Sequence, residues 1–149
     1  MTPRQARIWT ETGTGDGTGM VQWDEERHAL GAPEMDPTHR EFVAAVAALA
    51  AADDDRFAGL MDELMAHTRE HFENEGRLMR ACAFPVIPEH EGEHARVLAD
   101  LEHLRRGVDA GRIQFARHYV REGLLEWFSN HVATMDAALA VCLRYSRER

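Results

Sequence analysis

The chain has 149 residues, of which 44% are hydrophobic and 29% charged, so its composition is that of one globular domain rather than a disordered chain. Its formal net charge of −9 would repel a phosphate backbone, and no basic cluster offsets that charge, which excludes nucleic acid as an expected partner. The longest apolar run, at residues 42–52, is too short to span a membrane, and no secretory signal is recognisable. We therefore expect a cytoplasmic protein whose two cysteines, Cys82 and Cys142, are reduced thiols.

The first residues of the chain differ in composition from the rest. Residues 10–20, TETGTGDGTGM, are rich in glycine and threonine and have almost nothing to bury. We expect a flexible N-terminal extension over residues 1–20 and one helical domain over residues 21–149. Within that domain, GAPEMDP at residues 31–37 predicts a loop that ends where Asp36 caps a helix with Pro37 in its first turn.

Four stretches with helical spacing of apolar residues follow this loop. The first runs to about Ala52, and the second begins after the acidic residues 53–55 and ends at the proline-containing break at residues 83–88. The third begins at Pro88 and ends near Gly107, and the fourth covers residues 115–143. No stretch shows sustained strand alternation. The expected fold class is therefore all-α, an antiparallel up-down-up-down four-helix bundle.

Histidines and carboxylates fall on the apolar faces of these helices, where an unpaired charge would cost several kcal/mol. Residues four apart on a helix project from adjacent turns toward the same point. Two helices carry such pairs, in HFENE and HEGEH, and the first helix adds one histidine in DPTHREF. The fourth helix offers HVATMD, whose i+5 spacing places the two side chains about 140° apart on an α-helix and so is a looser arrangement. The candidate ligands are His39, His71, Glu75, His90, His94, His131 and Asp136.

Five histidines and two carboxylates are enough to hold two metal ions. If each carboxylate bridges both ions and a solvent oxygen also bridges them, three histidines complete six-coordination on one ion. Two histidines leave the other ion with five ligands and one open position. A site rich in imidazole and bridged by carboxylates suits iron, because zinc favours four ligands and calcium and magnesium avoid nitrogen.

The motifs EMDPTHREF, HFENEGRLM, HEGEH and WFSNHVATMD resemble those of the hemerythrins, in their single-domain bacterial form, over roughly residues 23–145. The resemblance implies a non-haem di-iron cofactor with an oxo or hydroxo bridge. His90, His94 and His131 would hold the six-coordinate iron, and His39 and His71 the five-coordinate iron. Glu75 and Asp136 would bridge the two ions.

The resemblance also implies a function, which is reversible binding of O₂ or another small diatomic ligand for oxygen storage, delivery or sensing. Delivery would be to an oxygen-consuming enzyme, and the protein itself would not be an enzyme. Four apolar residues close to the ligands are expected to wall the open position and keep it dry. They are Phe72, Trp127, Phe128 and Val132.

Two other functions stay open at this point. One is a di-iron oxidase or ferroxidase, or a protein that handles NO or peroxide. Ferritin-like enzymes place Glu-x-x-His on two helices, whereas this chain has one such string, Glu91 to His94. The other is an interaction module that is metal-free or stabilised by zinc.

Residues near these motifs are given structural roles. His67 is expected at the boundary of the metal site, and three histidines are expected on the surface, namely His28, His103 and His118. The glutamates of HEGEH are expected to be solvated charges at a helix start. Two residues depart from the hemerythrin pattern: Ala83 replaces a glycine in the loop after the second helix, and Phe128 is bulkier than the expected aliphatic residue.

Overall fold

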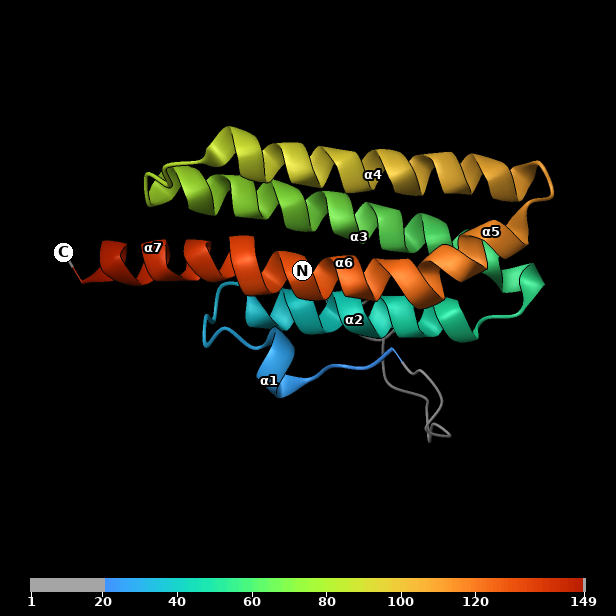
Figure 1. Cartoon of the computed structure of the whole chain (residues 1–149), viewed down its shortest axis with the longest axis horizontal. Coiled ribbons are helices and arrows are strands. Elements are labelled where there is room, and N and C mark those ends of the chain that lie inside the picture. Colours follow the sequence, from blue (N-terminus) through green and yellow to red (C-terminus); the bar gives the residue numbers. More distant parts are fainter. Residues whose placement is uncertain (1–20, 149) are drawn as a thin grey trace.

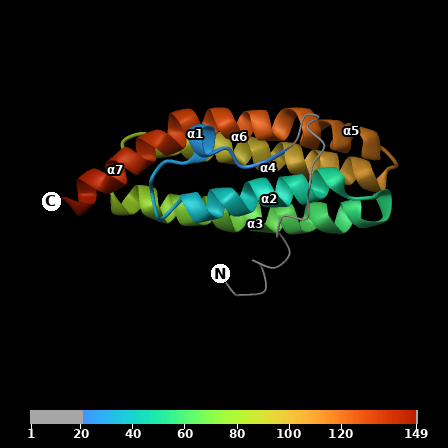
Figure 2. The same cartoon turned by 90° about the horizontal axis from the view of Figure 1, so that it is seen from below.

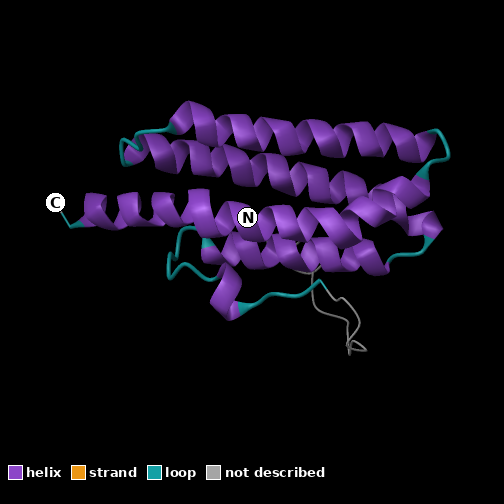
Figure 3. Ribbon diagram, viewed as in Figure 1, coloured by secondary structure: helices purple, strands orange, loops and turns teal. Residues whose placement is uncertain are grey.

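The computed structural model describes residues 21–148, which are mostly helical and contain no strand (Figure 3). Four long helical segments run antiparallel beside one another (Figure 1), which confirms the predicted four-helix bundle. The predicted extension at residues 1–20 lies outside the described residues, and the domain boundary at residue 21 stays a prediction. The first three long helices are α2 (Asp36–Ala51), α3 (Asp54–Ala81) and α4 (Ile87–Asp109), and a short helix, α1 (Glu25–His28), precedes them.

The fourth long segment is continuous but not uniformly α-helical. It consists of α5 (Ile113–His118), η1 (Tyr119–Leu124), α6 (Leu125–His131), η2 (Val132–Asp136) and α7 (Ala137–Arg147), where η marks a π-helical turn. This segment closes the bundle, because α5 contacts α4 and η1 contacts α2, while α3 packs between α2 and α4 (Figures 1 and 2). No helix within residues 21–148 is long and apolar enough to span a bilayer.

The helix ends follow from local chemistry, with one correction. Asp53 caps α3 as its position suggests, since its side chain accepts a hydrogen bond from the Arg56 amide. Asp36 was predicted to cap the first long helix, but it is instead the first residue of α2. Its carboxylate accepts from the backbone amides of Leu30 and Ala32 at 2.9 and 3.2 Å. Asp36 therefore fixes the preceding loop rather than the helix start.

The turn after α3 explains why the glycine missing from the sequence pattern matters. Ala83 has φ +57°, in the left-handed region that favours glycine. The Ala83 amide donates to the Arg80 carbonyl at 3.3 Å, and the Phe84 amide donates to the Met79 carbonyl at 2.8 Å. These two bonds are those of a Schellman motif, in which Ala83 holds the position that glycine usually takes.

The short helix α1 was not predicted, and the expectation that His28 is a surface residue was wrong. His28 is only 1% exposed. Its Nδ1 accepts a hydrogen bond from the Asp24 amide at 3.0 Å, so its Nε2 carries the proton and donates to the Ser129 hydroxyl at 2.9 Å. The ring also lies 5.4 Å from that of Phe128. His28 thus fastens the segment before α2 to the fourth helical segment.

Two apolar clusters fill the bundle at different levels. The larger cluster includes Phe42, Leu64, Val97 and Phe128, and the smaller one includes Met35, Met79, Leu139 and Leu143. On each long helical segment the predicted ligands come between residues of the two clusters in the sequence. The polar site is therefore layered between two apolar regions that exclude water from it.

Candidate metal centre

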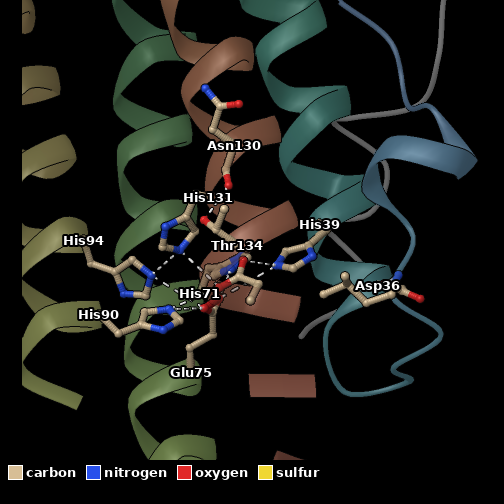
Figure 4. Close-up of polar contacts among 11 residues, drawn as sticks. Asp36, His39, His71, Glu75, His90, His94, Asn130, His131 and Thr134 are labelled. Carbon is tan, nitrogen blue, oxygen red and sulfur yellow. Dashed lines mark hydrogen bonds and ion pairs between the residues drawn. The ribbon is translucent and has the colours of Figure 1, made fainter. Parts of the chain in front are cut away.

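All seven candidate ligands point into one buried cluster, with no residue more than 7% exposed (Figure 4). Helix α2 supplies one histidine, α3 a histidine and a glutamate, α4 two histidines, and the end of α6 with η2 the last histidine and the aspartate. Their ligand atoms form two overlapping sets in which all atoms lie within 4.8 Å of one another. One set is Glu75, His90, His94, His131 and Asp136, and the other is His39, His71, Glu75 and Asp136.

Each shared carboxylate directs one oxygen to each set. In the three-histidine half, Asp136 Oδ1 lies 3.1 Å from Nε2 of both His90 and His131, and Glu75 Oε1 lies 3.5 Å from Nε2 of His94. In the two-histidine half, Asp136 Oδ2 lies 3.2 Å from Nε2 of His39, and Glu75 Oε2 lies 2.5 Å from Nε2 of His71. Two carboxylates arranged in this way can bridge two cations.

Several of these atoms have no hydrogen-bond partner, which is costly for buried polar groups. Within the described part of the chain, His39 Nε2 and both Asp136 oxygens are buried without an aligned partner, despite lying 3.2 Å or less from an opposite group. His94 Nε2 and His131 Nε2 face each other at 3.0 Å. Atoms that converge without bonding one another are directed at common points between them. The residues therefore fit two metal ions.

The charges of the cluster are strongly coupled. Burial acts to lower the pKa of His39 and of His90, but the adjoining Asp136 and Glu75 carboxylates outweigh it and raise each to about 9. Burial instead dominates at His94 and lowers its pKa to about 3.

Burial opposes the ionised form of both carboxylates, yet the surrounding histidines hold the pKa of Glu75 and of Asp136 below the usual range. Without metal, the site at neutral pH therefore holds two anionic carboxylates and protons on some imidazoles. A metal ion must displace those protons in order to bind.

The second π-helical turn, η2, brings His131 and Asp136 to the same site. The Ala137 amide donates to the Val132 carbonyl, five residues earlier, which is the π-helical pattern. The Thr134 hydroxyl donates to the Asn130 carbonyl at 2.7 Å (Figure 4), so a side chain supports the backbone at this turn. The wider turn places residues five apart on one face, and this accounts for the i+5 spacing that an α-helix would not align.

Aromatic rings hold the histidines in place on both halves. The Phe72 ring is stacked on His94 at 3.7 Å, and the Trp127 ring is stacked on His131 at 4.8 Å. Phe128 instead contacts the other half, with its ring 5.4 Å from that of His39. Of the four predicted pocket residues, Phe72 and Trp127 thus lie against the three-histidine half and Phe128 against the two-histidine half, while Val132 is fully buried.

The glutamates of HEGEH do more than the solvated charges that were expected. Glu91 pairs with Arg80 at 2.6 Å and so links α4 to the end of α3. Glu93 accepts a hydrogen bond from the Trp127 indole at 2.8 Å, and thereby fixes the ring that is stacked on His131. Sequence reasoning missed this support because Trp127 is 34 residues from Glu93, and no local pattern signals the contact.

The other histidines lie outside the two ligand sets. His67 is buried beside His71, with ring centroids 6.5 Å apart, and the Thr38 backbone is among its contacts. Burial lowers the pKa of His67 to about 4. His103 and His118 are exposed, as expected.

Comparisons with known proteins agree with this geometry. The family described as "Hemerythrin HHE cation binding domain" matches residues 30–142. A bacteriohemerythrin of Ralstonia nicotianae is 36% identical over 124 residues, covering 83% of this chain and 89% of that protein. A myohemerythrin of Riftia pachyptila is 25% identical, covering 76% and 86%. The fold is similar to a crystal structure of a leucine-to-tyrosine mutant of hemerythrin, with a TM-score of 0.72, 20% identity, and coverage of 85% of this chain and 98% of the other. The chain belongs to the hemerythrin family.

Proposed function

We propose that this protein binds O₂ reversibly at two non-haem irons held by the seven clustered residues, for oxygen storage, delivery or sensing. The observation that carries the proposal is that Glu75 and Asp136 each direct one oxygen to a three-histidine set and one to a two-histidine set. Membership of the hemerythrin family supports oxygen binding rather than catalysis. A cytoplasmic location and transfer of O₂ to an oxygen-consuming enzyme are parts of the same proposal.

The two halves have different roles in this proposal. His90, His94 and His131 hold the coordinatively saturated iron, and His39 and His71 hold the iron with an open position. Glu75 and Asp136 bridge the two ions. When bound, the iron pair supplies the electrons and the vacant position that reversible O₂ binding requires.

The protein residues around the site favour release of O₂ over further reaction. Phe128, 3% exposed, covers the two-histidine half and excludes water from it. The histidines keep the pKa values of Glu75 and Asp136 low, so neither carboxyl holds a proton to donate at neutral pH. Trp127 and Phe72 restrict movement of the rings of His131 and His94.

The experiment is anaerobic loading with Fe²⁺, followed by metal analysis and cycles of O₂ addition and removal. We expect about two irons per chain, an absorption band that appears with O₂, and loss of that band when O₂ is removed. The exposed substitution His118→Ala should behave as the native protein. Irreversible oxidation at the first exposure to O₂ would overturn the carrier function.

Two further measurements separate the proposal from its alternatives. Multiple turnovers with excess Fe²⁺ or peroxide would indicate an oxidase or ferroxidase instead. Retention of zinc in preference to iron, with no response to O₂, would indicate a structural metal site. A His90→Ala variant that keeps both irons would contradict the ligand assignment.

A further inference from the structure

The two cysteines of the chain lie together, although 60 residues separate them in the sequence. Cys82 is the residue at which α3 ends, and Cys142 lies within α7. The Cys142 thiol donates a hydrogen bond to the Cys82 carbonyl oxygen at 3.1 Å. Both thiols are free and partly exposed, so small molecules can reach them.

The two sulfur atoms are neighbours and not merely on adjacent helices. A carbonyl oxygen and its own side chain branch from the same Cα, so a sulfur 3.1 Å from that oxygen is within reach of the Cys82 sulfur after a rotamer change. Burial and then contact with the Cys142 thiol raise the pKa of Cys82 to about 12. Little thiolate exists at neutral pH, so the pair reacts slowly and stays reduced until a strong oxidant accumulates.

We propose that Cys82 and Cys142 form a reversible intramolecular disulfide when the protein meets a hydroperoxide. One thiolate attacks the peroxide, the O–O bond breaks, and a sulfenic acid and one molecule of water (or alcohol) form. The second thiol then attacks the sulfenic sulfur, the S–O bond breaks, and water leaves as the S–S bond forms. The two thiols lose two electrons and two protons, and the peroxide is reduced by those two electrons. A dithiol reductant reverses the process.

The position of the pair gives this disulfide a structural consequence. Cys82 follows Glu75 by about two helical turns at the end of α3, and Cys142 follows Asp136 by a similar distance along the fourth segment. The bond would therefore connect the two helical segments that carry the shared carboxylates. It would brace one end of the metal site, and only this consequence rests on the proposed function.

The test treats full-length, iron-loaded protein with hydrogen peroxide, removes the peroxide, and then counts thiols after denaturation. We expect both thiols to disappear together, the mass of the chain to fall by about 2 Da as two hydrogens are lost, and dithiothreitol to restore both. Peptide mapping should find Cys82 joined to Cys142. The matched controls are Cys82→Ser and Cys142→Ser, which should gain oxygen on the remaining sulfur instead of losing hydrogen.

A second readout measures the brace. The thermal midpoint of the disulfide form should exceed that of the dithiol form by ~5–10 °C, and iron should leave to a chelator more slowly. Cys142→Ser treated in the same way corrects for any effect of iron oxidation and should show neither change.

Oxygen addition without a crosslink, or crosslinks between chains, would overturn the proposal. An unchanged thermal midpoint would remove the bracing role. The thiol count and the mass do not depend on bound iron, so failure of the di-iron function would be recognised separately.

Discussion

His28→Ala tests whether the segment before α2 is fastened to the bundle through a buried histidine. The substitution removes hydrogen bonds to the Asp24 amide and to the Ser129 hydroxyl, which is only 4% exposed. Leaving such partners unpaired costs about 1 kcal/mol each at the low end. Lost ring contacts with Trp23 and Phe128, at 5.3 and 5.4 Å, add roughly 0.5 kcal/mol each. The expected loss in the free energy of unfolding is about 3 kcal/mol.

Urea unfolding of the metal-free protein, followed by far-UV circular dichroism, measures this loss. With an m-value of roughly 2 kcal/mol/M, the midpoint should fall by about 1.5 M. His118→Ala removes an exposed imidazole and should change the free energy of unfolding by less than about 0.5 kcal/mol. His28→Phe keeps a ring but not the hydrogen bonds, so it should fall between the two. If His28→Ala and His118→Ala gave the same midpoint, the fastening role would be refuted.

The same substitution has a predicted pH dependence. Burial, and then the nearby Arg27 charge, lower the pKa of His28. The folded protein therefore binds this proton less tightly than the unfolded chain, whose histidine pKa is about 6.5. The contribution of neutral His28 is present above pH ~6.5 and is lost as the pH falls below that value. The difference between native protein and His28→Ala should accordingly be smaller at pH ~5 than at pH ~7.5.

Three further predictions concern the metal site and its surroundings. Asp136→Asn removes one shared carboxylate charge with little change of volume, and metal analysis should find less than about one iron per chain. In the metal-free protein, the raised pKa values of His39 and His90, about 9, stabilise the fold below pH ~6.5, and this contribution is lost as the pH rises toward 9. The urea midpoint should therefore fall over that range, and it should do so much less in iron-loaded protein, whose histidines are already neutral ligands. Ala83→Gly relieves a left-handed backbone conformation and should raise the free energy of unfolding by about 1 kcal/mol in the same assay, whereas a lower midpoint would contradict the assigned strain.

Local patterns explain what the sequence could predict. The four helices follow from apolar spacing and from breaks such as Pro85 and Pro88. The clustering of histidines and carboxylates follows from i+4 spacing on three of the helices, once those helices are placed around one core. Their roles as iron ligands, and the wall of the O₂ pocket, stay proposals that metal analysis and spectroscopy can test.

The missed features all depend on contacts between distant residues or on backbone details. His28 was assigned to the surface because its partner Ser129 lies 101 residues away. Glu93 resembled a solvated residue because nothing near it in the sequence indicates the Trp127 indole. The alignment of His131 with Asp136 depends on a π-helical turn, and no helical period calculated for a regular α-helix predicts one.

That turn also controls how the end of the chain packs. Removing one residue between Val132 and Met135 would let the segment close as a regular α-helix, and everything after it would rotate by about 100° relative to α6. Asp136 would leave the metal site, and Leu139 and Leu143 would turn away from the smaller apolar cluster. A one-residue deletion that makes the helix more regular would therefore damage both the site and the core. Substitutions should be tolerated in this stretch far more readily than any change in its length.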